Sequence, residues 1–135
     1  MPKAHRPRGY TYDSALRIVT LDIAEDAGAA AIIEHFERVI VDSSIPLDAG
    51  CLVDLRHGAR IFLFNEVHEF TRWFDGRSRL LQGRRAFITQ RPGEMGAANI
   101  FCAFLRPRGI EAEVFTDEES AIAWLCSSEC RVRAI

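Results

Sequence analysis

Three short apolar runs constrain the fold of this chain more than any other feature of its sequence. They are CLVDL (51–55), RAFIT (85–89) and AEVFT (112–116). Each is five residues long and mostly apolar, a pattern typical of strands buried on both faces. Stretches long enough to form helices separate the runs, and strands that alternate with helices usually pair in parallel. The sequence therefore predicts an α/β domain with a mostly parallel sheet.

A β-hairpin is expected before this alternation begins. Residues 10–13 (YTYD) are followed by a break at Asp13-Ser14 and then by ALRIVTLDI, which ends at Ile23. The second segment is rich in β-branched side chains, which favour strands. Because a hairpin pairs its two strands antiparallel, the complete sheet should be mixed.

Helices are expected between and after the strands. Apolar residues recur at offsets of three and four in 24–41, 61–81 and 94–106, which indicates amphipathic helices. Thr116, with Glu119 three residues later, predicts a capping box that begins a final helix.

The element order is therefore ββαβαβαβα in a single α/β domain. We expect an N-terminal tail over 1–9, the α/β domain over 10–126 and a C-terminal tail over 127–135.

Composition and charge exclude several classes of function. Hydrophobic residues make up 48% of the 135 and charged residues 27%, which is typical of globular proteins. The formal net charge of −2 gives no general attraction to nucleic acid. No apolar run approaches the roughly 20 residues of a transmembrane segment, and no signal-peptide core follows the basic N-terminus. With reduced cysteines, a cytoplasmic location is expected.

Three segments carry a resemblance to a known family. They are CLVDLR (51–56), EMGAANIF (94–101) and EVFTDEESAIAWL (113–125). Together with the element order, they resemble the STAS domain, and in particular bacterial STAS-like domains described as anti-anti-sigma-factor-like. The resemblance implies a single STAS-like domain over 10–126 that serves as a regulatory module and binds other proteins. It also implies a relation in fold to lipid-binding SEC14 domains, and thus a lipid ligand as an alternative.

The phosphorylated serine of partner-switching STAS proteins has no counterpart here. The resemblance places that serine near Phe62 and Leu63, yet no hydroxyl side chain occurs between Leu55 and Thr71. The other Asp-Ser pair lies in VDSSIP, at residues 41–46. There it follows a helix C-terminus, where a phosphate would meet the negative end of the helix dipole. We interpret these serines as turn residues.

A binding site for an anion is predicted at the carboxyl ends of the parallel strands, where α/β domains bind ligands. Arg56, His57 and Arg91 follow the predicted strands, and Gly93 and Gly96 lie at the start of a helix. Glycine lets a backbone approach an anion closely at a helix N-terminus. A small anionic ligand or an acidic partner is therefore one hypothesis. The alternative is that these residues serve only solubility and turn formation.

No catalytic or metal site is predicted. The four histidines have no partners at metal-ligand spacing, and no nucleophile stands beside a base in a recognisable motif. Cys126 and Cys130 are one helical turn apart, but a metal would need further ligands from elsewhere. We therefore expect no enzyme activity and no cofactor.

Aromatic residues of the second expected helix suggest an interaction surface. Phe62, Phe64 and Trp73 fall partly outside the apolar stripe of 61–81. One interpretation is an apolar surface that binds a protein partner, a second copy of the chain or a lipid tail. The other is that this helix is buried on more than one side, under the N-terminal arm or a neighbouring helix.

The leading hypothesis is a non-enzymatic STAS-like regulatory or protein-interaction module that lacks the phosphorylatable serine. It would act as a homodimer through the second helix and the Arg56-His57 loop. The alternative is a small-molecule or lipid-binding domain with a pocket in the same region. An enzyme built on Arg56, His57 and Arg91 is a third, weaker hypothesis.

Overall fold

The computed structural model describes residues 9–23, 29–56, 68–69, 72–73 and 83–127. Their elements, in chain order, are β1 (Tyr10–Asp13), β2 (Ile18–Asp22), α1 (Ala29–Val41), β3 (Gly50–Asp54), β4 (Arg85–Ile88), α3 (Pro92–Leu105), the 3-10 turn η2 (Arg106–Arg108), β5 (Ala112–Phe115) and α4 (Glu118–Cys126). Residues 68–69 and 72–73 are also helical, and the remainder of the helix expected over 61–81 lies outside the described residues.

The five strands form one sheet in the order β1-β2-β3-β4-β5. The hairpin strands β1 and β2 pair antiparallel, and every later neighbour pairs parallel. The predicted α/β fold with a mixed, mostly parallel sheet is confirmed, and so is the hairpin.

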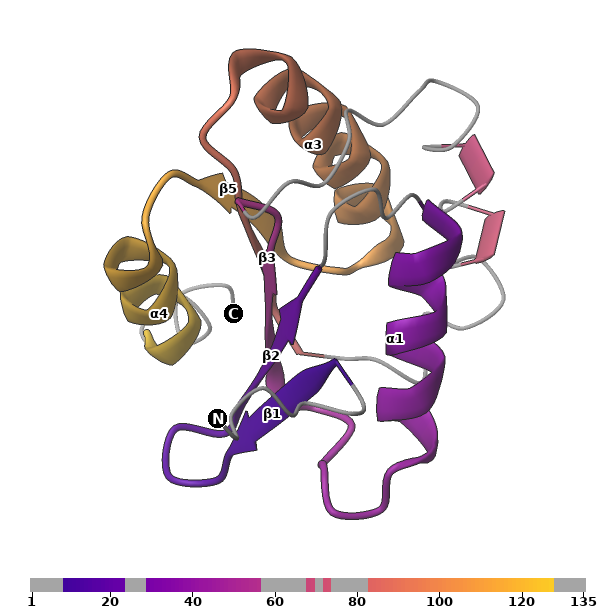
Figure 1. Cartoon of the computed structure of the whole chain (residues 1–135), viewed down its shortest axis with the longest axis vertical. Helices are drawn as coiled ribbons and strands as arrows, with labels where there is room; N and C mark the ends of the chain where they lie inside the picture. The colour runs from indigo at the N-terminus through magenta and orange to yellow at the C-terminus, as the bar shows by residue number, and fades with distance from the viewer. Residues whose placement is uncertain (1–8, 24–28, 57–67, 70–71, 74–82, 128–135) are drawn as a thin grey trace, which may run out of the picture.

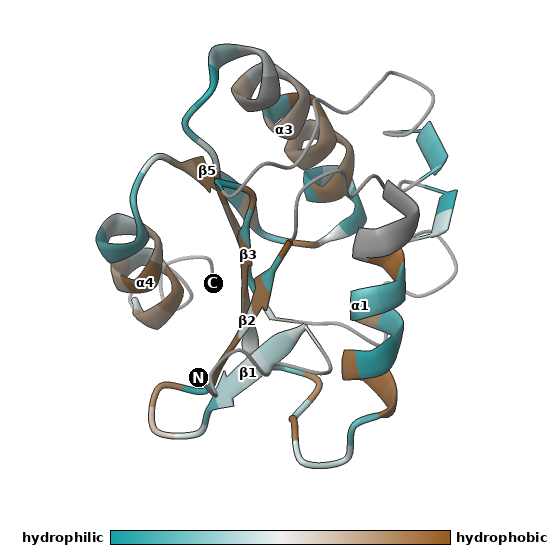
Figure 2. Cartoon of the chain, viewed as in Figure 1, coloured by the Kyte–Doolittle hydropathy of each residue, from teal (hydrophilic) through white to brown (hydrophobic). Residues whose placement is uncertain are grey.

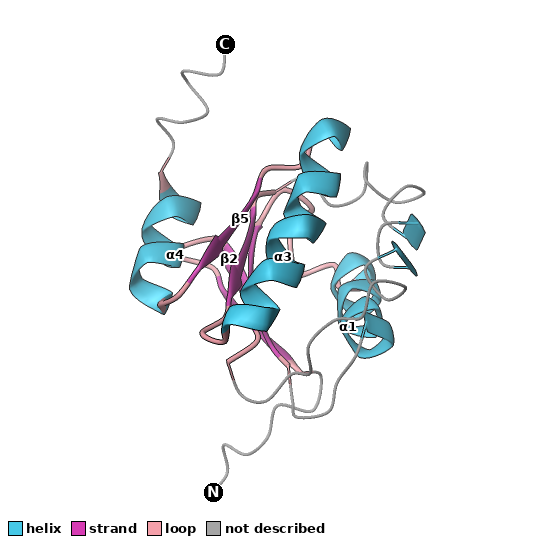
Figure 3. Ribbon diagram, turned by 90° about the horizontal axis from the view of Figure 1, so that it is seen from above, coloured by secondary structure: helices cyan, strands magenta, loops and turns pink. Residues whose placement is uncertain are grey.

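The strand order decides which face of the sheet each helix covers. Parallel strands are joined by right-handed crossovers, so crossovers that advance in one direction place their helices on the same face. Helices α1 and α3 cover that face, and among the described helices only α4 packs on the other (Figures 1 and 3).

Two apolar cores follow from this layering. The larger lies between the sheet and the α1/α3 layer, where Phe87 of β4 meets Phe101 of α3 edge-on with ring centroids 5.5 Å apart. The smaller joins Leu52, Ile88 and other residues of the sheet to Ala121 of α4. The central strands are apolar, whereas β1 is polar along much of its length (Figure 2).

The starts of two helices differ from the sequence prediction. Helix α3 begins at Pro92, two residues earlier than expected, because proline is favoured in the first helical turn. The capping box predicted at Thr116 is wrong. Asp117 is the N-cap of α4, and its carboxylate accepts a hydrogen bond from the Ser120 backbone N–H.

None of the described helices is long and apolar enough to cross a membrane.

Candidate functional site

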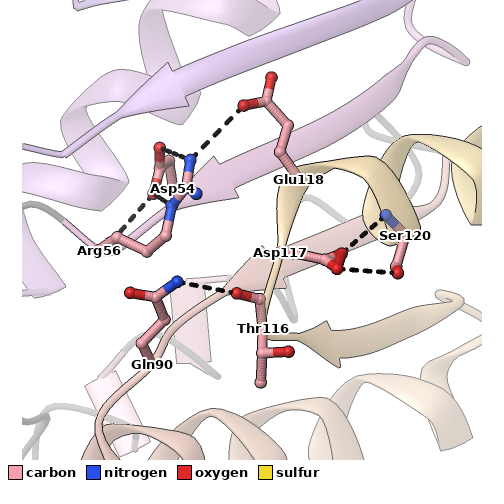
Figure 4. Close-up of polar contacts among 7 residues, drawn as sticks. All are labelled: Asp54, Arg56, Gln90, Thr116, Asp117, Glu118 and Ser120. Carbon is pink, nitrogen blue, oxygen red and sulfur yellow. Dashed lines mark hydrogen bonds and ion pairs between the residues drawn. The ribbon is translucent and has the colours of Figure 1, made fainter.

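Polar residues gather where β3, β4 and β5 end, at the edge that the sequence predicts for ligand binding. Asp54 is the last residue of β3, Gln90 follows β4, and Thr116 and Asp117 follow β5. Figure 4 shows these side chains together with Arg56 and the first turn of α4. We call this group the carboxyl-edge cluster: Asp54, Arg56, Gln90, Thr116, Asp117, Glu118 and Ser120.

Arg56 is held mainly by Asp54. Its Nε and Nη2 donate to the two carboxylate oxygens of Asp54, each at 2.9 Å, and its backbone N–H donates to Oδ1 at 3.0 Å. Asp54 is only 7% exposed, so this bidentate pair satisfies a carboxylate that is largely removed from water. The hydrogen bond with Asp54 raises the pKa of Arg56 above its ordinary value.

A second, longer contact links Arg56 to α4. The distance from its Nη2 to Glu118 Oε1 is 3.5 Å, and the Glu118 side chain is 54% exposed. A pair this exposed contributes little to stability, but it orients Glu118 toward the end of β3. Arg56 therefore connects β3 with the start of α4, and its charge is already balanced by two carboxylates.

The N-terminus of α4 is organised by Asp117. Its Oδ1 accepts from the Ser120 backbone N–H at 2.9 Å, and its Oδ2 accepts from the Ser120 hydroxyl at 3.1 Å. These bonds lower the pKa of Asp117. Nearby, Gln90 Nε2 donates to the Thr116 carbonyl at 3.1 Å, which ties the loop after β4 to the loop after β5.

The charge balance at this edge is negative among the described residues. Besides Arg56, Arg91 is the other cation here, and it is exposed at the N-cap position of α3. Carboxylates outnumber the two arginines: Asp22, Asp54, Asp117, Glu118 and Glu119. Asp22 and Asp54 are direct neighbours across the β2–β3 pair. The edge therefore suits a basic partner better than the anion predicted from the sequence.

The predicted glycines lie at the start of α3. Gly93 and Gly96 are both exposed. A side-chain Cβ at Gly96 would meet no atom within 4 Å, so packing does not require glycine there. The anion site built on Arg56, Arg91 and these glycines stays a prediction.

Of the predicted aromatic surface, only Trp73 is described, and it packs on α1. Its ring centroid lies 6.0 Å from that of Phe36, and its Nε1 donates to Glu37 Oε2 at 3.0 Å. This contact favours burial against a neighbouring helix, the second of the two interpretations. His57, Phe62 and Phe64 lie outside the described residues.

The stretch VDSSIP forms a turn after α1, as predicted. Asp42 accepts hydrogen bonds from the Ser44 hydroxyl at 2.6 Å and from the Ser44 backbone N–H at 3.0 Å. Its other carboxylate oxygen accepts from Tyr10 Oη at 2.7 Å, which ties the turn to β1.

The described cysteines do not provide a reactive thiolate in the core. Burial raises the pKa of Cys51 and of Cys102 to about 12 in each case, so both are neutral thiols at physiological pH. Within the described ranges, no group of three or more His, Cys, Asp or Glu side chains is placed to hold a metal ion.

Sequence reasoning missed a cavity at the opposite edge of the sheet. It measures about 220 Å³ and is lined by Arg84, Arg106, Glu111, Ala112, Glu113 and Trp124. The available signal was the pair Arg84-Arg85 at the start of a buried strand, where charged side chains need specific partners.

A comparison of the chain with family models found no match, and comparisons with curated proteins and with solved structures found none either. The fold and the carboxyl-edge cluster define an α/β domain whose polar edge is pre-arranged by internal ion pairs and hydrogen bonds.

Proposed function

We propose that this protein is a non-enzymatic interaction module whose carboxyl-edge cluster binds a basic segment of a protein partner. The observation that carries the proposal is the set of contacts within the cluster. Asp54, Arg56 and Asp117 are bonded to neighbouring groups. Groups arranged in this way form a fixed surface, which suits recognition. The resemblance to STAS domains supports a regulatory use of such a surface.

The negative charge at the carboxyl edge of the sheet indicates that the partner segment is basic. Asp117, Glu118 and Glu119 are consecutive and exposed, and they lie beside the partly buried Asp54–Arg56 pair. The positive end of the α4 dipole offsets part of this charge, but only within the first helical turn. The remaining negative potential would steer lysine- or arginine-rich segments toward the edge.

Charge reversal at the edge tests the proposal. The double variant Glu118→Lys/Glu119→Lys changes the edge, and the control Glu34→Lys/Asp48→Lys makes the same net change elsewhere. Each form is purified from the cells that naturally produce the protein. We expect the same partner proteins to co-purify with the wild type and the control, and to be absent from the edge variant. With a purified partner, binding should weaken as salt increases, because exposed charges are screened. Equal capture by all three forms would contradict the proposal.

A small-molecule role is the second candidate, and the observation that favours it is the cavity lined by Arg84, Arg106 and Trp124. Its volume of about 220 Å³ is below the roughly 300–1,000 Å³ typical of pockets for drug-sized ligands, so it suits a smaller molecule. It also lies beside α4 and β5, whereas the sequence prediction placed a pocket at the second helix. The homodimer predicted through Phe62 and Phe64 stays a prediction.

A further inference from the structure

The cavity beside β5 combines opposite charges with an aromatic wall. It lies at the amino ends of β4 and β5, the edge opposite the carboxyl-edge cluster. Two cations, Arg84 and Arg106, and two carboxylates, Glu111 and Glu113, line it together with Ala112 and Trp124. Its volume of about 220 Å³ leaves room for a molecule smaller than most drugs.

Arg84 is the buried residue among the four charged residues of this group. Its side chain is 4% exposed, and its Nε donates to Glu111 Oε1 at 2.7 Å. Nη1 donates to the Trp124 carbonyl, and the guanidinium carbon lies 5.1 Å from the centroid of the Trp124 ring. Nη2 is shielded from solvent and has no hydrogen-bond acceptor among the described residues. A buried donor without an acceptor is costly, so the site lacks one polar partner.

Arg106 and Glu113 form the exposed side of the cavity. Arg106 Nε and Nη2 donate to the Ala112 carbonyl at 3.1 and 2.9 Å. The ion pair between Arg106 Nη2 and Glu113 Oε1 is long, at 3.5 Å, and both side chains are nearly half exposed. Such a pair contributes little to stability, so a ligand can separate it at small cost.

The charges exclude simple ions as good ligands. An anion alone would meet Glu111 and Glu113, and it would also face the C-termini of α3 and α4, which carry partial negative charge. A cation alone would meet the two arginines. A molecule that carries both charges close together avoids both conflicts.

We propose that this cavity binds a small zwitterion of the α-amino-acid type with an apolar side chain. Its carboxylate would accept from Arg106 and supply the acceptor that Arg84 Nη2 lacks. Its ammonium group would pair with Glu113, and its side chain would contact Trp124 and Ala112. This site names the ligand class for the small-molecule role, and it is independent of the proposed binding of a basic segment, because it lies at the opposite edge of the sheet.

Three related molecules distinguish this chemistry from general binding. Leucine carries both charges, leucinamide lacks the carboxylate, and 4-methylpentanoate lacks the ammonium group. Because Nη2 is shielded in the free protein, we expect the Trp124 ring to shift on binding. The Trp124 indole N–H signal in ¹H–¹⁵N NMR spectra of the full chain should therefore move saturably with leucine at up to about 10 mM, and the two analogues should bind at least about tenfold more weakly.

Substitutions of cavity residues test whether the leucine-induced shift of the Trp124 signal arises from binding in the cavity. Glu113→Gln and Arg106→Gln should each weaken leucine binding about tenfold or more. Glutamine at 106 can still donate to the Ala112 carbonyl, so the strand edge stays covered. The control Arg17→Gln, which breaks the exposed pair between Arg17 and Asp48, should bind leucine like the wild type. The proposal is overturned if leucine causes no saturable shift, if the three molecules bind equally, or if both cavity variants retain wild-type affinity.

Discussion

At the scale of single residues, the buried Gly83 and the helical Gly96 have opposite surroundings. A Cβ at Gly83 would overlap the backbone carbonyl of Ala49, whereas a Cβ at Gly96 would meet open space within α3. We expect Gly83→Ala to lower the free energy of unfolding by about 1–3 kcal/mol, because the backbone of a neighbouring segment must shift. We expect Gly96→Ala to raise it by about 0.5–1 kcal/mol, because alanine favours the helix. Urea unfolding measures both.

Each glycine variant serves as the control for the other, since both add one methyl group. A loss of stability in Gly96→Ala would show that α3 is packed differently from the structure described above. An unchanged Gly83→Ala would contradict the close approach to Ala49.

The cysteines should differ strongly in reactivity. Cys51 and Cys102 are buried with raised pKa values, whereas Cys126 is exposed at the end of α4. We expect iodoacetamide at about pH 8 to modify Cys126 in the native protein and to leave Cys51 and Cys102 intact, because alkylation requires an accessible thiolate. Mass spectrometry of proteolytic peptides assigns each site. All three should react in urea, and native labelling of Cys51 would contradict its burial.

At the scale of elements, helix α4 depends on its N-cap. The pKa of Asp117 is lowered in the folded protein by bonds from Ser120, so its contribution to stability is present above the unfolded pKa. That contribution is lost as the pH falls through the lower, folded value, in the range below about pH 4. Asp117→Asn keeps an acceptor but cannot ionise. We therefore expect the urea midpoint of this variant to fall less steeply below pH 4 than that of the wild type.

The control for this pH dependence is Glu119→Gln, which removes a carboxylate from the same helical turn without touching the cap. Its acid profile should follow that of the wild type more closely. If Asp117→Asn and the wild type lose stability in parallel as the pH falls, ionisation of Asp117 does not contribute to the acid dependence of stability, and the prediction is wrong.

Most elements were predictable because their signals are local. The strands CLVDL, RAFIT and AEVFT are short apolar runs, and the structure places β3, β4 and β5 within one residue of each. The N-cap of α4 was assigned one residue too early, because Thr116 and Asp117 are both good capping residues and only geometry separates them.

The candidate site was less predictable, since it depends on contacts between distant segments. The sequence indicated that Arg56 would reach the carboxyl edge. It did not indicate that Asp54, two residues earlier, would take up its guanidinium, or that Glu118 would lie near it. Likewise, Arg84 approaches Trp124 across 40 residues, a contact that no local pattern encodes.

For the whole molecule, β1 and β5 are the edge strands of the sheet, and the outer edge of β5 is one of the two places where unwanted pairing with another chain could begin. Arg106 covers this edge by donating twice to the Ala112 carbonyl. Charged side chains that block an edge in this way prevent association through open strands. We expect Arg106→Ala to form larger species as concentration rises, whereas Arg108→Ala, which removes a neighbouring arginine, should match the wild type. Light scattering after size-exclusion chromatography measures this, and identical masses for both variants would contradict the protective role.

The sequential strand order also bears on how the chain assembles. Each strand pairs with the one that precedes it in the chain, from β1 to β5, so no strand has to enter between two that are already joined. A polypeptide leaving the ribosome can therefore extend its sheet one strand at a time, and every strand finds its neighbour already synthesised. Pairing with the preceding strand closes a shorter loop than pairing with a more distant strand would, and a shorter loop costs less chain entropy. Until β5 has been synthesised, β4 is an exposed edge strand of the partial sheet. β5 then pairs with β4 and completes the sheet.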